Sequence, residues 1–227
     1  MIEQIPPTVL SLITDPGWDP ASMIEPEHTR ALHEIVDASG EAIEGNLFTL
    51  HQQHPLPEQP EPSLRGKRRN FALYVTGGAS LLEIGFNAGH SCLLALSVNP
   101  TLRYVGVDLG EHAYTEACFR YLHSVFPGRV ELVTGDSREV LPLAGQFDRF
   151  HMDGGHGLEI AASDLRAVIS MACPDATILV DDINQHHISA ICDWHELQGD
   201  LASVAIGSLW THTGRHQNKV FRIAKAT

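Results

Sequence analysis

The stretch Ser80-Leu-Leu-Glu-Ile-Gly-Phe-Asn-Ala-Gly-His-Ser91 decides the fold of this chain. It begins as an apolar strand that runs through Glu83 to Gly85, and Gly89 follows four residues later. Residues 91–98 come next, are mostly Cys, Leu, Ala and Val, and predict a helix. Gly85 permits a tight strand-to-helix turn, and Gly89 lets the helix start pack near the strand. We expect free N–H groups at this turn to hold a carboxyl-rich ligand, the alternative being an ordinary strand-to-helix turn.

Two further predicted strands end next to acidic residues. The strand at residues 103–108 ends at Asp108, about 20 residues beyond the first turn, where nucleotide-binding units place the acceptor for the ribose hydroxyls. The strand at 129–134 is followed by Gly135-Asp136-Ser137, where a carboxylate could accept from an adenine amino group. The glycine spacing differs from the G-x-G-x-x-G of dinucleotide sites, which argues against a nicotinamide oxidoreductase.

Strand and helix patterns then alternate, which predicts an α/β fold: a doubly wound, mostly parallel seven-stranded sheet with helices on both faces. Further helices are expected at residues 113–126, 158–172 and 186–197. The strands are expected at residues 80–84, 104–108, 130–133, 147–152, 177–180, 201–206 and 219–224. No helix separates the last two strands, so we expect a hairpin and an antiparallel last strand.

Residues 1–76 are expected to form a helical extension in front of the main domain at 77–227. Ser22 to Glu25 has the form of a capping box, and the apolar spacing beyond it predicts one helix that runs to about Glu44. A second short helix is expected at residues 67–76.

The proline-rich segment between Pro55 and Pro62 cannot be a helix or a central strand. We expect residues 22–62 to cover the ligand site as a lid that contributes acceptor contacts. The alternative is a solvated tether to a dimerisation helix.

The bulk composition excludes several functions. A net charge of −13 argues against a nucleic-acid partner, and the basic cluster at residues 65–69 is interpreted as a solvated entry to the domain. The N-terminus does not have the pattern of a signal peptide, and no apolar run approaches the length of about 18 residues that a membrane span needs. The cysteines are widely spaced and predict reduced thiols in a cytoplasmic protein: Cys92, Cys118, Cys173 and Cys192.

Acidic residues also follow the fourth and fifth predicted strands. Asp153 comes after one, and the pair Asp181 and Asp182 after the other. If these strands are neighbours, the three carboxylates converge and repel one another unless a cation lies between them. Oxygen ligands of this kind favour Mg²⁺, Mn²⁺ or Ca²⁺. The alternative is that the acids cap the helices that follow.

From Leu81 onward the chain resembles the class I S-adenosylmethionine-dependent methyltransferases. Its acids resemble those of the divalent-metal-dependent O-methyltransferases of the catechol and caffeoyl-CoA type and of the type that modifies antibiotic sugars. The resemblance implies metal ligation by Asp153, Asp181 and Asp182, where Asp182 departs from the Asn of the catechol type. It also implies His156 as the general base, in the place of a lysine, with Asp153 beside it. The cofactor contacts that it implies are Glu83, Gly85, Asn87, Gly89, Ser91, Asp108, Asp136, Ser137 and Asp153.

The implied function is divalent-metal-assisted O-methylation of a small-molecule hydroxyl, with Mg²⁺ as the expected ion and a homodimer as one possible assembly. Two other classes stay open: a metal-free N- or C-methyltransferase, and a non-catalytic cofactor-binding protein. For the metal site itself there is also an alternative, a zinc ion bound by His156, Asp153 and either His186 or His187. His151 and His212 also lie where site residues could be.

Overall fold

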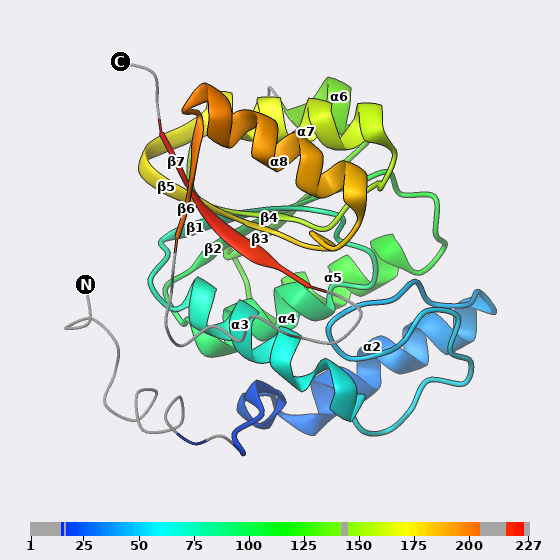
Figure 1. Ribbon diagram of the computed structural model, residues 1–227. Coiled ribbons are helices and arrows are strands. Elements are labelled where there is room, and N and C mark those ends of the chain that lie inside the picture. Colours follow the sequence, from blue (N-terminus) through cyan, green and yellow to red (C-terminus); the bar gives the residue numbers. More distant parts are fainter. Residues whose placement is uncertain (1–14, 16, 142–144, 205–216, 225–227) are drawn as a thin grey trace.

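A computed structural model describes residue 15 and residues 17–141, 145–204 and 217–224 of the chain, and these residues form a seven-stranded sheet (Figure 1). The strands are β1 (Ser80–Ile84), β2 (Arg103–Asp108), β3 (Val130–Thr134), β4 (Phe147–Met152), β5 (Ala172–Val180), β6 (Leu201–Ser203) and β7 (Lys219–Ile223). Their order is β3-β2-β1-β4-β5-β7-β6. The first five strands are parallel, and β7 runs antiparallel to both of its neighbours.

This topology confirms the predicted doubly wound sheet with an antiparallel last strand. β1 pairs with β2 on one side and with β4 on the other, so the strand order reverses at β1. Ligands of such sheets bind beyond the carboxyl ends of the strands at that reversal. The fold therefore places the expected site at the end of β1.

Helices cover both faces of the sheet (Figure 1). One face carries α3 (Arg65–Val75), α4 (His90–Val98) and α5 (Thr115–Val125), with α2 (Pro26–Ser39) packed outside α4 and α5. The other face carries α6 (Ser137–Val140), α7 (Leu158–Met171) and α8 (His186–Gln198). Alternate strand residues supply the two apolar cores: Leu81 belongs to the first and Leu82 to the second.

Most element boundaries lie close to the predicted ones. β5 is the main exception among the strands, because it starts at Ala172 directly after α7 rather than at residue 177. Asp175, which has a φ of 62°, lies where the pairing between β4 and β5 shifts its register. Part of the predicted strand at 201–206, and His212 in the loop that follows, lie outside the described residues.

α2 is shorter than predicted. It ends at Ser39 and not near Glu44, because Gly40 takes the left-handed conformation, with a φ of 74°. That conformation commonly closes a helix. The apolar Ile43 beyond it is buried although it lies outside the helix.

The predicted capping box at the start of this helix is wrong. Ser22 belongs instead to a 3₁₀ helix, η2 (Pro20–Met23), which Asp19 caps by accepting from the N–H of Ala21 at 3.0 Å. Pro26 fixes the first turn of α2 without a side-chain cap.

The basic cluster is buried, which corrects the prediction of a solvated entry. Lys67, Arg68 and Arg69 lie on α3 and are each no more than 6% exposed. Buried charges are costly unless they are paired. Arg69 donates to the backbone oxygen of Asp15 at 2.6 Å, and the other two side chains have carboxylate partners.

Arg68 ties the extension to α3. Its Nε donates to Asp19 Oδ1 at 2.9 Å, and a terminal nitrogen donates to Asp19 Oδ2 at 2.5 Å. The other terminal nitrogen donates to the backbone oxygens of Leu47 at 2.8 Å and Glu61 at 3.0 Å. One fully buried guanidinium thus ties Leu47 and Glu61 of the segment after α2, and Asp19 before α2, to α3.

The four cysteines are free thiols, and Cys92, Cys118 and Cys192 are buried, as the sequence predicts. In the described part of the chain, none of the helices combines the length and the apolar character that crossing a membrane requires.

We expect Arg68→Met to lower the free energy of unfolding by about 3 kcal/mol, because it leaves a carboxylate and two buried carbonyls without their donor. Asp19 keeps some contact with water, which limits the loss. The matched control is Arg120→Met, which removes an exposed pair with Glu116 and should cost about 0.5 kcal/mol or less. Urea denaturation measures both, and equal losses would contradict the tying role of Arg68.

Candidate active site

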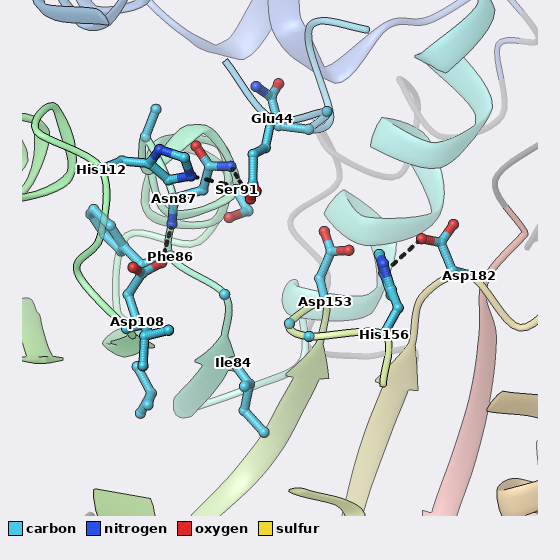
Figure 2. Close-up of a pocket in the computed structure, with 18 of the residues that line it drawn as sticks. Glu44, Ile84, Phe86, Asn87, Ser91, Asp108, His112, Asp153, His156 and Asp182 are labelled. Atoms are coloured by element: carbon cyan, nitrogen blue, oxygen red, sulfur yellow. Dashed lines mark hydrogen bonds and ion pairs between the residues drawn. The ribbon is translucent and has the colours of Figure 1, made fainter. Parts of the chain in front are cut away.

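A cleft of about 770 Å³ opens at the carboxyl edge of the sheet, a size typical of small-molecule sites. Two groups of polar side chains face each other across it (Figure 2). One group, which we call the Asp108 end, consists of Asn87, Asp108 and His112. The other group, the Asp153 end, consists of Lys67, Asp153, His156 and Asp182.

The turn between β1 and α4 is closed by hydrogen bonds within the chain. Gly85 N–H donates to Val107 O at 2.8 Å, and Gly89 N–H donates to Phe86 O at 2.8 Å. These two N–H groups are therefore not free for a ligand, and Gly89 does not line the cleft. Gly85 has a φ of 97°, and a Cβ atom there would lie 2.2 Å from Asp153 O. The close approach of β1 to the segment after β4 therefore requires glycine at this position.

Asp108, at the end of β2, fastens the loop beside it. Its Oδ2 accepts from the N–H of Asn87 at 2.7 Å, and its Oδ1 accepts from the N–H of Gly110 at 2.8 Å. Asn87 Oδ1 is buried and has no hydrogen-bond partner among the described residues. Since Asn87 and Asp108 both line the cleft, this oxygen is suited to accept from a donor on a bound ligand.

Glu83 lies beneath the cleft and does not line it, which corrects the expected direct contact with a cofactor. Its fully buried carboxylate accepts from Ser91 Oγ at 2.6 Å, from the Tyr104 hydroxyl, and contacts His151 Nδ1 at 2.5 Å. Burial alone would lower the pKa of His151, but Glu83 outweighs burial and raises it. Glu83 therefore holds α4, β2 and β4 against β1.

Asp136 and Ser137 line the cleft where the chain leaves β3. Asp136 caps α6 by accepting from the N–H of Arg138 at 2.9 Å, and its carboxylate also pairs with the Arg138 guanidinium. These hydrogen bonds lower the pKa of Asp136 to about 2. Asp136 thus faces the cleft as a carboxylate whose oxygens already have a donor.

The segment after α2 forms the outer wall of the cleft, and the residues between 44 and 51 that line it are Glu44, Gly45, Asn46, Leu47, Thr49, Leu50 and His51. The wall is fastened to the loop after β2. Glu41 accepts from the N–H of Ala113 at 3.1 Å and contacts His112 Nδ1 at 3.0 Å. Glu44 lies 3.4 Å from the other ring nitrogen of His112 and accepts from the Asn87 amide at 3.4 Å (Figure 2).

Lys67 is a site residue that the sequence analysis assigned to the solvated surface. α3 brings its Nζ into contact with the carboxylate of Asp181 and to 3.9 Å from Asp153 Oδ2. Burial alone would lower the pKa of Lys67, but the two carboxylates outweigh burial and hold it above its ordinary value. The side chain is therefore a buried cation between the ends of β4 and β5. Burial raises the pKa of Asp153.

His156 and Asp182 form a second pair at the Asp153 end. His156 Nε2 lies 3.0 Å from Asp182 Oδ2, and the histidine side chain is half exposed (Figure 2). The hydrogen bond to Asp182 raises the pKa of His156 above its ordinary value. Asp182 adopts a left-handed backbone conformation, with a φ of 51°.

The three acids predicted to bind a metal do not form one ion site. Asp153 and Asp181 face Lys67, whereas Asp182 pairs with His156. Mg²⁺ or Ca²⁺ needs oxygen ligands at about 2.0–2.6 Å, and the ammonium group of Lys67 lies against the carboxylates that would have to supply them. A site for the expected ion between Asp153 and Asp181 would therefore require Lys67 to move away.

Two groups of potential metal ligands occur among the described residues: His151 with Asp153 and Asp181, and Asp153 with His156 and Asp182. Neither group includes His186 or His187, so the zinc alternative gains no support. His187 instead lies against the backbone of the site, with its Nε2 2.5 Å from His156 O.

Residues 82–183, which run from β1 to just beyond β5, match a family model described as a methyltransferase domain. This stretch is therefore similar to methyltransferase domains. It carries the floor of the cleft, including Gly85, Asp108 and Asp153. This match and the shared fold agree with the expectation of a class I methyltransferase.

Solved structures of methyltransferases share this fold at low sequence identity. Cofactor-bound Rv0187 from MTB has a TM-score of 0.60 and 20% identity, covering 88% of this chain and 91% of that one. The O-methyltransferase TomG from Streptomyces achromogenes, involved in tomaymycin synthesis and solved with S-adenosylmethionine, has a TM-score of 0.58 and 17% identity, covering 86% and 90%. The precorrin-6y C5,15-methyltransferase from Geobacter metallireducens has a TM-score of 0.54 and 15% identity, covering 84% and 96%. No curated protein matches the chain significantly.

The site contains two features that the sequence analysis missed. Lys67, Phe71 and Tyr74 recur at helical spacing and lie buried on α3, a pattern that the neighbouring arginines obscured. The approach of Glu44 to Asn87 is a long-range contact, and no local pattern signals it.

Gly85→Ala should destabilise the protein by more than the ~1–2 kcal/mol that a left-handed alanine costs, because its Cβ also meets the backbone at Asp153. Gly128→Ala is the matched control, with a φ of 74° and no atom within 4 Å of the added Cβ. Urea unfolding of both variants measures the difference. If they lose the same stability, β1 does not approach the segment after β4 as closely as described.

Proposed function

We propose that this methyltransferase transfers the methyl group of S-adenosylmethionine to a hydroxyl of a small molecule bound at the Asp153 end of the cleft. The pair formed by His156 and Asp182 carries the proposal. A hydroxyl must lose its proton when it accepts a methyl group, and histidine is the side chain suited to take a proton near neutral pH. The similarity to TomG, itself an O-methyltransferase, agrees with this acceptor class.

The Asp108 end fits the cofactor. Asp108 stands at the end of β2, where this class of sheet places the acceptor for ribose hydroxyls. The unpartnered Asn87 Oδ1 offers a further acceptor beside it, and Asp136 with Ser137 lies where the adenine would be bound. S-adenosylmethionine carries hydroxyl and amino groups that can satisfy such acceptors.

When bound, S-adenosylmethionine supplies a methyl group on a positively charged sulfur, which keeps the S–CH₃ bonding pair as the O–CH₃ bond forms. In the chain itself, His156 donates its Nε2–H to Asp182, which leaves Nδ1 to take the proton of the acceptor hydroxyl. Asp182 stabilises the imidazolium that results. The half-exposed ring can then release the proton to water.

Residues 44–51 serve in this proposal as the cover over the acceptor. They line the cleft from the side opposite the sheet, and Arg68 and Glu41 fix them in place. A cover of this kind excludes water from the sulfonium group and its acceptor. The net charge of −13 favours a small molecule over a nucleic acid as that acceptor.

The direct test incubates the protein with S-adenosylmethionine that bears an isotopically labelled methyl group and a set of small molecules with phenolic, catechol and sugar hydroxyls. Mass spectrometry should find the label on an oxygen atom. Label found only on nitrogen or carbon acceptors would contradict the proposal and favour one of the other methyltransferase classes.

Asp108→Ala should weaken S-adenosylmethionine binding by about 1.5–3 kcal/mol, because the ribose hydroxyls lose a charged acceptor. Asp108→Asn should lose less, since one side-chain oxygen remains. Glu131→Ala is the control for the change in net charge, because this exposed residue on β3 does not line the cleft. Titration calorimetry measures the affinities, and an unchanged affinity in Asp108→Ala would remove this residue from the cofactor site.

The rate of methyl transfer should rise with pH through the pKa of His156, since only the neutral ring can take the hydroxyl proton. Asp182 stabilises the charged ring and raises that pKa, so Asp182→Asn should move the rising limb to lower pH. Asp153, Asp181, Lys67 and His187 also surround His156 and stay in place in this variant.

His156→Gln should abolish the rise of the rate with pH and lower the rate itself by about 10²–10⁴-fold. His123→Gln on the exposed surface of α5 is the control. A limb that stays at the same pH in Asp182→Asn would show that another group is the base.

A further inference from the structure

The cation at the Asp153 end is part of the chain itself. Lys67 Nζ contacts the carboxylate of Asp181 and lies 3.9 Å from Asp153 Oδ2, while its side chain is only 6% exposed. Two carboxylates at the ends of neighbouring strands would repel each other without a positive charge between them. Lys67 supplies that charge.

The position of the Lys67 charge is fixed by the anchoring of α3 to the sheet. Two turns along α3, the Tyr74 hydroxyl lies 2.6 Å from the backbone oxygen of Thr177 and 3.1 Å from the N–H of Phe150. These contacts anchor α3 to β4 and β5, the strands that carry the two carboxylates. Lys67 cannot leave without a shift of the helix or a new rotamer that loses both partners.

Lys67 also reaches the cleft, because it is one of the residues that line it. An ammonium group has three N–H donors, and its two carboxylate contacts are the ones that the structure gives it among the described residues. One donor is therefore available to an oxygen atom of a molecule in the cleft, next to the pair formed by His156 and Asp182.

We propose that the ammonium group of Lys67 takes the place of a divalent metal ion between Asp153 and Asp181 and holds the acceptor oxygen, so that methyl transfer by this protein needs no metal. The catalytic half of this inference rests on the proposed function, whereas the replacement of the ion does not. The fixed charge stabilises the acceptor oxygen as its proton moves to His156. The single positive charge of Lys67 offsets one of the two carboxylate charges and lowers their mutual repulsion without an added ion.

Binding of Mn²⁺ tests the replacement without any need for turnover. Electron paramagnetic resonance should detect no saturable Mn²⁺ site in the wild-type protein up to about 1 mM, the weak end of the range for oxygen sites. Lys67→Met should bind Mn²⁺ below about 0.1 mM, because it frees two adjacent carboxylates for the ion. The matched control is Arg103→Met, which removes an exposed ion pair with Glu131 at the start of β2, far from the Asp153 end. This variant should bind Mn²⁺ no better than the wild type.

Activity tests the catalytic half. Prolonged dialysis against EDTA should leave the wild-type rate unchanged, and Lys67→Met should lose about 10²–10³-fold, as when one donor to a developing charge is removed. A wild-type rate that falls with EDTA and recovers with Mg²⁺ or Mn²⁺ overturns the proposal. A saturable Mn²⁺ site in the wild type also overturns it, and the loss of that site in His156→Gln would locate the ion at the second ligand group, beside Asp182.

If Lys67→Met does not fold, the Mn²⁺ titration of the wild-type protein and the EDTA experiment still decide the question. A folded Lys67→Met protein that gains no Mn²⁺ site overturns the replacement. If no hydroxyl compound is methylated while the Mn²⁺ results hold, the proposed function fails and the replacement of the ion by Lys67 stands.

Discussion

A buried ammonium between two strand-end carboxylates is the interaction on which the architecture of the site depends. Lys67 reaches Asp181 and Asp153 only because α3 lies across β4 and β5. Breaking a buried ion pair by removing one partner is far more costly than losing a surface pair. The position of α3, and with it the extension that α3 anchors, is therefore coupled to the charge balance at the carboxyl edge of the sheet.

The two ends of the cleft differ in how their polar side chains are used. At the Asp108 end, the Asp108 carboxylate holds backbone of the neighbouring loops in place, and Glu83 does the same for side chains beneath the cleft. At the other end, His156 keeps contact with water while Asp182 orients its ring. This division suits a reaction in which the protein mainly aligns two molecules and accepts one proton.

Local patterns in the sequence predicted the sheet and the strand-end acids because both follow from short-range periodicity and from the rule that ligands bind at carboxyl ends. Asp108 and Asp153 indeed line the cleft. Lys67 was misjudged because a run of basic residues is typical of solvated surface, and burial depends on partners that lie far away in the chain. Glu83 was predicted to contact a cofactor but is buried in the scaffold. Its three partners lie on other elements, so the sequence of its own strand does not reveal them.

The hydrogen bonds of Arg68 close a loop in the segment after α2, and the second half of the cover over the cleft lies within it. The carbonyl groups of Leu47 and Glu61 both accept from one guanidinium, so the chain between them begins and ends at the same side chain of α3. Phe48 and Leu56 within this loop are buried in the core and resist exchange, whereas Leu50 is exposed and also lines the cleft. The shape of this wall of the cleft can therefore change through a few residues of one loop, while the anchor on α3 and the sheet stay as they are.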